Sequence, residues 1–96
     1  LQRLGPRNPS TAYIEGLVLY QQSEYADAQA AFEESLRGAP DSQLALFFLG
    51  ASHFAQQHWQ QAERSLQQFL RAQPQSAEAA RMLALVRLRV AEAMAA

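Results

Sequence analysis

The chain repeats itself after 34 residues, and this feature constrains its fold more than any other. When residues 9–42 are aligned with residues 43–76, seven positions are identical and three more pair one aromatic residue with another. The identical pairs are Gly16/Gly50, Gln22/Gln56, Ala28/Ala62, Leu36/Leu70, Arg37/Arg71, Pro40/Pro74 and Ser42/Ser76, and the aromatic pairs are Tyr13/Phe47, Tyr20/Phe54 and Tyr25/Trp59. A period of this length predicts a solenoid, in which each repeat is one unit that stacks on the next.

The repeat also predicts how the chain is divided. The predicted parts are a first repeat at residues 9–42, a second repeat at residues 43–76, and a C-terminal helix at residues 77–96 that is a partial third repeat or a cap. Residues 1–8 carry Arg3 and Pro6 at the positions that close the other units. We therefore interpret residues 1–8 as the tail of a truncated preceding repeat.

Each unit has the pattern of two amphipathic helices, because apolar residues recur at spacings of three and four. The predicted helices are Ser10–Gln22, Tyr25–Arg37, Ser42–Gln57, Trp59–Ala72 and one from Ser76 to about Ala95. A proline follows each second helix. We expect it to end the helix, because proline cannot donate a hydrogen bond within a helix. Ser10, Ser42 and Ser76 are placed to cap the helix that follows. The sequence therefore predicts an all-α fold.

Two glycines fall inside predicted helices, where glycine costs about 1 kcal/mol relative to alanine. Gly16 and Gly50 occupy equivalent positions of the two repeats. A close approach of two helices would compensate for this cost, and we expect Ala28 and Ala62 of the partner helices to provide it.

These positions together resemble the tetratricopeptide repeat. That family has a small residue at the eighth position of its unit, an aromatic residue near the seventeenth, alanine at the twentieth, a large apolar residue at the twenty-fourth and proline at the thirty-second. The corresponding residues here are Gly16, Tyr25, Ala28, Phe32 and Pro40, and then Gly50, Trp59, Ala62, Leu66 and Pro74. The resemblance covers residues 9–76 closely and residues 77–95 loosely. Glu15 and His53 depart from it, since the family has leucine and tyrosine at those positions.

The resemblance implies an α-α superhelix of two antiparallel helix pairs plus a long C-terminal helix. The first helix of each repeat would line a concave groove that holds a peptide or helix of a partner protein. Carried over position by position, the groove residues are Tyr13, Leu17, Tyr20, Gln21, Phe47, Ala51, Phe54, Arg81, Leu85 and Arg89. We expect Tyr13 and Phe47 to be partly exposed, and Tyr20 and Phe54 to lie deeper. An acidic group on the ligand would suit Arg81 and Arg89.

Other functions find little support in the sequence. No motif of a nucleophile with its base, and no glycine-rich phosphate loop, is present, so we predict that the protein is not an enzyme and has no cofactor. The chain has no cysteine, and two histidines five residues apart, His53 and His58, lack a third ligand, so we predict no metal site. The net charge of -1 argues against nucleic acid, and no apolar run is long enough to span a membrane.

The C-terminal helix suggests a second kind of function. Met82, Leu83, Leu85, Val86 and their apolar neighbours surround it more completely than one adjacent helix can cover. We therefore expect self-association through residues 78–94, in the form of a homodimer. The two functional hypotheses are a scaffold that binds another protein in its groove and a self-assembly module of a larger repeat protein.

A second resemblance concerns the source of the chain and its cellular compartment. The stretch "TAYIEGLVLYQQSEYADAQAAFEESL" is similar to long bacterial repeat proteins of the cell envelope, including those of exosortase-associated exopolysaccharide systems. This similarity leaves the compartment open between the bacterial cytoplasm and the periplasm or cell envelope.

Overall fold

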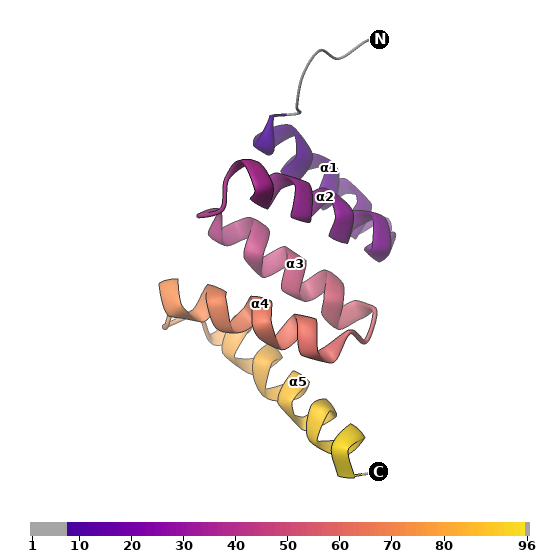
Figure 1. Ribbon diagram of the computed structural model, residues 1–96, viewed down its shortest axis with the longest axis vertical. Coiled ribbons are helices and arrows are strands. Elements are labelled where there is room, and N and C mark those ends of the chain that lie inside the picture. Colours follow the sequence, from indigo (N-terminus) through magenta and orange to yellow (C-terminus); the bar gives the residue numbers. More distant parts are fainter. Residues whose placement is uncertain (1–7, 96) are drawn as a thin grey trace.

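The computed structural model describes residues 8–95, and this part of the chain contains helices and no strand (Figure 1). The helices are α1 (Pro9–Gln21), α2 (Tyr25–Gly38), α3 (Gln43–Ala55), α4 (Trp59–Ala72) and α5 (Ala77–Ala95). The all-α prediction is confirmed. The interpretation of residues 1–8 as the tail of a truncated repeat falls, apart from Asn8, outside the described residues.

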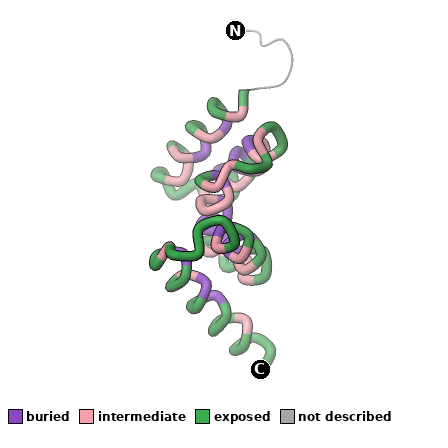
Figure 2. The backbone as a smooth tube through the Cα atoms, turned by 90° about the vertical axis from the view of Figure 1, so that its left-hand side faces the viewer, coloured by how far each residue is buried: buried purple, intermediate pink, exposed green. Residues whose placement is uncertain are grey.

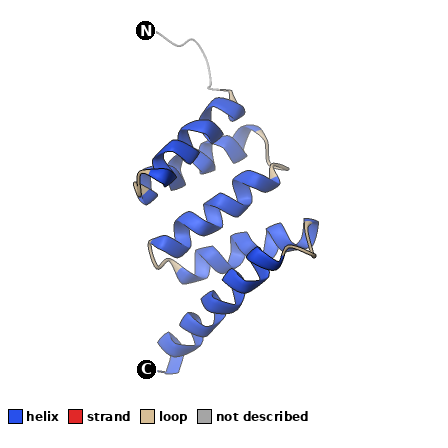
Figure 3. Ribbon diagram, turned by 180° about the vertical axis from the view of Figure 1, so that it is seen from behind, coloured by secondary structure: helices blue, strands red, loops and turns tan. Residues whose placement is uncertain are grey.

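Consecutive helices pack against each other along an elongated stack with extents of 50 × 26 × 19 Å. The chain zigzags through α1 to α4, and α5 lies at the far end against α4 (Figures 1 and 3). Helix α1 also touches α3. This stacking of helical pairs is the arrangement that the 34-residue period predicts, because a single pair cannot bury its apolar side alone.

Side chains cap three of the helices as the sequence suggests, with one correction. Ser42 Oγ accepts a hydrogen bond from the Ala45 amide at 3.3 Å, and Ser76 Oγ accepts one from the Ala79 amide at 3.2 Å. Ser10 is not a cap, because α1 begins at Pro9 and the side chain of Asn8 accepts from the Ser10 amide at 2.7 Å. Proline at the first helical position explains the shift, since it needs no hydrogen-bond partner there.

The two hairpin turns use the same backbone device. Ser23 and Gln57 both adopt a left-handed conformation, with φ of 62° and 64°. The prediction that the third helix runs to Gln57 is wrong, because α3 ends at Ala55 and the chain reverses over the next residues. Left-handed residues end a helix by redirecting the chain, and a non-glycine residue there carries a steric cost.

Two apolar clusters hold the stack together. The first lies around Ala28, Phe32 and Leu49, which belong to α2 and α3 and pack against apolar residues of α1. The second lies around Leu66 and Phe69 of α4 and extends to α5. Figure 2 shows the buried residues on the sides of the helices that face one another. The core is therefore a row of contacts along the stack rather than a single centre.

The glycines do mark close helix contacts, and the nearest side chains of the partner helices are Phe32 and Leu66. A Cβ atom added to Gly16 would lie 2.6 Å from the Phe32 ring, and one added to Gly50 would lie 3.1 Å from Leu66. Ala28, the residue expected to approach Gly16, is fully buried, yet the Phe32 ring fills the space above the glycine. The missing side chain thus makes room for a large neighbour.

Candidate partner-binding face

The predicted groove residues of α1 form a half-buried aromatic surface. Tyr13, Leu17 and Tyr20 are each partly exposed, and Gln21 is exposed. The rings of Tyr13 and Tyr20 are held from behind, because both make edge contacts with Phe48, at centroid distances of 6.4 and 5.6 Å. Each ring is therefore packed partly against protein and partly open to solvent.

Phe48 organises this surface, although it was not among the predicted groove residues. It stands on α3 and contacts Tyr13 and Tyr20 of α1, Phe32 of α2 at 5.9 Å, and its neighbour Phe47 at 5.3 Å. Its equivalent in the first repeat is Ile14, which is 60% exposed. Sequence alignment of the repeats therefore gave no sign that position 48 joins three helices.

The predicted groove residues of α3 divide into two kinds. Phe47 and Phe54 are half-buried, and the Phe47 ring lies 5.3 Å from that of Phe69. Ala51 is only 2% exposed, so it offers no surface to a ligand, and its assignment to the groove needs correction. An alanine at this position lets the neighbouring helices close over it, whereas the larger Leu17 in the first repeat stays partly exposed. Tyr13 and Phe47 are partly exposed, as expected, and so are Tyr20 and Phe54, which were expected to lie deeper.

Helix α5 contributes the most exposed of the predicted residues. Arg81 and Arg89 are exposed, and Leu85 is 50% exposed. Arg89 donates to Glu92 at 3.1 Å, and both side chains are more than half exposed, so this ion pair adds little stability. The α5 residues are therefore available for contact, while the aromatic residues of α1 and α3 are partly engaged in the core.

Electrostatic effects reach across the face. Burial raises the pKa of Tyr13 and is also the main cause that raises the pKa of Tyr20. The pKa of Tyr20 is raised further by Tyr25 and by Glu78, which stands at the start of α5. A charge on α5 therefore acts on a ring of α1. Glu78 was not predicted to belong to this face, and nothing in the repeat pattern marks it.

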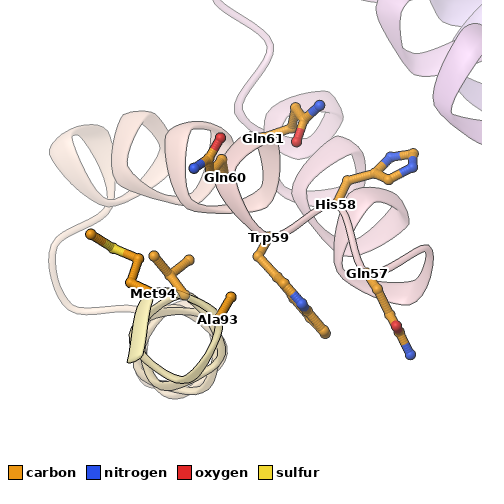
Figure 4. Close-up of a pocket in the computed structure, with 8 residues that line it drawn as sticks. Gln57, His58, Trp59, Gln60, Gln61, Ala93 and Met94 are labelled. Carbon is orange, nitrogen blue, oxygen red and sulfur yellow. The ribbon is translucent and has the colours of Figure 1, made fainter. Parts of the chain in front are cut away.

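A separate hollow of about 320 Å³ lies between the start of α4 and the end of α5. Its lining residues are Gln57, His58, Trp59, Gln60, Gln61, Val90, Ala93 and Met94. Figure 4 shows Trp59 extending beside the end of α5, where Ala93 and Met94 stand. None of the predicted groove residues lines this hollow, and it contains no cluster of charged groups. The buried residues of α5, Ala79, Leu83 and Val86, all precede the part of α5 that lines it.

The two histidines are closer than their sequence spacing suggests. His53 is buried and His58 is half-buried, and their Nδ1 atoms lie 3.4 Å apart because the chain reverses between them. Burial lowers the pKa of His53, and His58 and Arg64 lower it further, while Glu33 opposes the shift. In residues 8–95, no group of three or more histidine, aspartate or glutamate side chains could hold a metal ion.

Within the described part of the chain, none of the helices combines the length and the apolar character needed to cross a bilayer.

Two sequence families match the chain. Residues 1–69 are similar to the family described as "Anaphase-promoting complex, cyclosome, subunit 3", and residues 49–96 are similar to the family described as "Tetratricopeptide repeat". The two matches overlap on the second hairpin and together span the chain. No curated protein matches the sequence. The similarity to bacterial cell-envelope proteins therefore stays a prediction.

Proposed function

Because this chain belongs to the tetratricopeptide repeat family, whose members generally mediate protein–protein interaction, we propose that it is a non-catalytic scaffold that binds a segment of a partner protein. The observation that carries the proposal is the half-exposed aromatic surface of Tyr13, Tyr20 and Phe47, which Phe48 holds from behind. Rigid aromatic rings give a large contact area at low cost in conformational entropy, so they are common anchors of interfaces.

The chemistry of the face describes the ligand that it suits. Apolar side chains of an extended or helical segment would pack on Tyr13 and Phe47. An acidic group on the same segment would approach Arg81, which is exposed on α5. The family matched by residues 1–69 is described as a subunit of a complex, which agrees with a role in holding proteins together.

A peptide selection tests this proposal. Random-peptide phage display on the immobilised chain is expected to enrich peptides with apolar anchors and acidic residues. The Tyr13→Ala/Phe47→Ala double variant should then lose binding of the selected peptides by about tenfold or more, because truncating an anchor residue commonly costs more than about 1 kcal/mol. Val18→Ala is the control, since Val18 is an apolar α1 residue outside the predicted groove with 47% exposure.

Stability measurements separate binding from folding in this test. Circular dichroism and thermal unfolding of each variant are compared with its affinity for the selected peptides. If the double variant binds as tightly as the wild-type chain, the aromatic surface is not the binding site. If the double variant does not fold, the rings belong to the core, and the proposal for these residues fails.

A second candidate function is self-assembly, and a specific observation favours it. Leu85, Leu88 and Met94 on α5 are 50%, 54% and 80% exposed. Exposed apolar side chains gathered on one helix are typical of surfaces that meet another protein surface. The chain would then form homo-oligomers through α5, and sedimentation velocity over a range of concentrations measures this directly.

A further inference from the structure

Four exposed residues form a stripe along α5. Arg81, Leu85, Leu88 and Glu92 are all exposed and are spaced four, three and four residues apart. At about 100° per residue, these four side chains lie on one side of the helix, over a length of about 16 Å. The buried residues Ala79, Leu83 and Val86 lie on the opposite side, packed with α4. We call the four residues the α5 stripe.

The order of the stripe is self-complementary. Two leucines stand at its centre, a positive charge at one end and a negative charge at the other. In a twofold-symmetric contact, a residue i that meets residue j of the second copy is matched by j meeting i. An antiparallel copy centred between Leu85 and Leu88 therefore brings Arg81 opposite Glu92 twice, and Leu85 opposite Leu88 twice.

We propose that two copies of this chain associate through an antiparallel contact of their α5 helices, centred on Leu85 and Leu88 and closed at both ends by Arg81 with Glu92 of the second copy. The inference rests on the second of the two proposed functions, self-assembly. It assigns that function to four residues, one symmetry and one register.

The charges select this register over its neighbour. A shift of about one turn would place Leu85 opposite its own copy, and it would also bring Arg81 opposite Arg89 and Glu78 opposite Glu92. Both of these pairs carry like charges, which repel each other across an interface. The leucines alone would allow either register, so the end charges define the contact.

The charged residues are available for this contact. Arg81 makes no ion pair with any residue in the described range 8–95. Glu92 accepts from Arg89 of its own chain at 3.1 Å, through one carboxylate oxygen. That pair is exposed and weak, so Glu92 can also accept from an arginine of a second copy. Arg87 faces α4 instead, where it pairs with Glu63 at 3.3 Å.

The expected dimer is weak. One helix face per chain buries an area at the low end of specific interfaces, so the association is reversible and appears at high protein concentration. Arg81 and Leu85 also belong to the proposed groove surface, so a ligand that reaches α5 would compete with the second copy.

Sedimentation velocity on a charge-swap series tests the proposal. The series comprises the wild-type chain, Arg81→Glu, Glu92→Arg, the double variant Arg81→Glu/Glu92→Arg, and Arg71→Glu as a control with the same charge change at an exposed position of α4. We expect each single variant to raise the dimer dissociation constant about tenfold, since each creates two like-charge contacts. The double variant should recover most of the affinity, and the control should match the wild-type chain.

Three results would overturn the inference, and they are distinguishable from failure of the proposed functions. A chain that stays monomeric at every concentration removes both the stripe and self-assembly, and leaves the groove proposal intact. Dimers that persist in both single variants show that self-assembly uses another surface. A double variant that stays as weak as the single variants excludes the antiparallel register. Circular dichroism of each variant tests whether the helical content of the chain is unchanged.

Discussion

The first hairpin, α1–α2, and the second, α3–α4, share a backbone plan but fill it with different side chains. In each, an aromatic residue near the end of the first helix meets one at the start of the second, Tyr20 with Tyr25 and Phe54 with Trp59, both at 5.4 Å. The turn between them has a left-handed residue in each case. Features set by backbone geometry are therefore repeated after 34 residues.

The two hairpins differ where a large side chain covers the mid-helix glycine. In the first, the Phe32 ring lies over Gly16 and is itself held by Tyr13 and Phe48, each at 5.9 Å. In the second, the smaller and more adaptable Leu66 lies over Gly50. The same glycine position is therefore covered by a different side chain in each hairpin, and the two sites should differ in how well they accept an added methyl group.

The hairpins also differ in their content of histidine. The second has His53 and His58 near its turn, where the first has Leu19 and Glu24. Burial makes protonation of His53 unfavourable, and its neighbour His58 adds to this effect. Acid sensitivity of this kind should therefore arise in the second hairpin.

The largest expected effect comes from removing the Phe32 ring, which lies over Gly16 in the first hairpin. Phe32→Ala should lower the free energy of unfolding by about 3 to 5 kcal/mol, because Phe32 is fully buried and its loss leaves a cavity. Leu66→Ala, the equivalent change in the second hairpin, should cost about 2 to 5 kcal/mol and less than Phe32→Ala. Urea unfolding at one protein concentration measures both. An equal or larger loss for Leu66→Ala would contradict the view that Phe32 stabilises the first hairpin more than Leu66 stabilises the second.

The next effect separates the two glycines. Gly16→Ala should cost about 1 to 2 kcal/mol, because the added Cβ would lie 2.6 Å from a ring that is held on both sides. Gly50→Ala should change stability by less than about 1 kcal/mol, because alanine favours the helix and Leu66 can adjust. In a Phe32→Leu background, the cost of Gly16→Ala should fall, since the two residues are coupled. If thermal unfolding shows the same cost of Gly16→Ala in both backgrounds, contact with the Phe32 ring is not the cause of that cost.

A smaller effect should be equal in the two hairpins. Ser23→Gly and Gln57→Gly should each raise the free energy of unfolding by about 0.5 to 1 kcal/mol, because glycine adopts a positive φ without steric cost. Chemical denaturation of the single variants and the double variant measures this, and the two gains should add. A loss of stability in either variant would mean that its side chain has a role that the turn geometry does not explain.

The smallest effect distinguishes the hairpins by pH. The pKa of His53 is lowered from 6.5 in the folded chain. Below pH 6.5, His53 therefore binds a proton more readily in the unfolded chain than in the folded chain. The contribution of His53 to stability should therefore be fully present above pH 6.5 and should be lost as the pH falls. His53→Leu, which introduces the first hairpin's residue, should flatten this decline between pH 7.5 and 5.5 in thermal unfolding. An unchanged decline would assign it to other groups.

Much of the fold followed from local patterns. The spacing of apolar residues predicted all five helices, and Ser42 and Ser76 were predicted to cap the helices that follow them. Errors arose where two devices competed locally, as at Pro9 and Asn8, which took the place of Ser10. The end of α3 at Ala55 was placed two residues too late, because the left-handed residue Gln57 lies within a polar stretch that marks the turn but not its first residue.

The candidate face was harder to predict. Family positions correctly indicated that Tyr13 and Phe47 are partly exposed, but they also named Ala51, which the structure buries. Phe48 was missed, because its equivalent Ile14 in the first repeat is exposed. Exposure depends on which helix comes next in the stack, and α1 and α3 pack against different helices.

The sequence alone determined the helices, their order and the stacking of repeats, because helix periodicity, caps and helix breakers act over a few residues and a 34-residue period demands that units pack on each other. Only the tertiary structure decided which side chain fills each glycine notch, that His53 and His58 touch, and which side of α5 stays exposed. These outcomes depend on side chains from different helices sharing the same space, and packing between helices follows shape and volume that no single segment encodes.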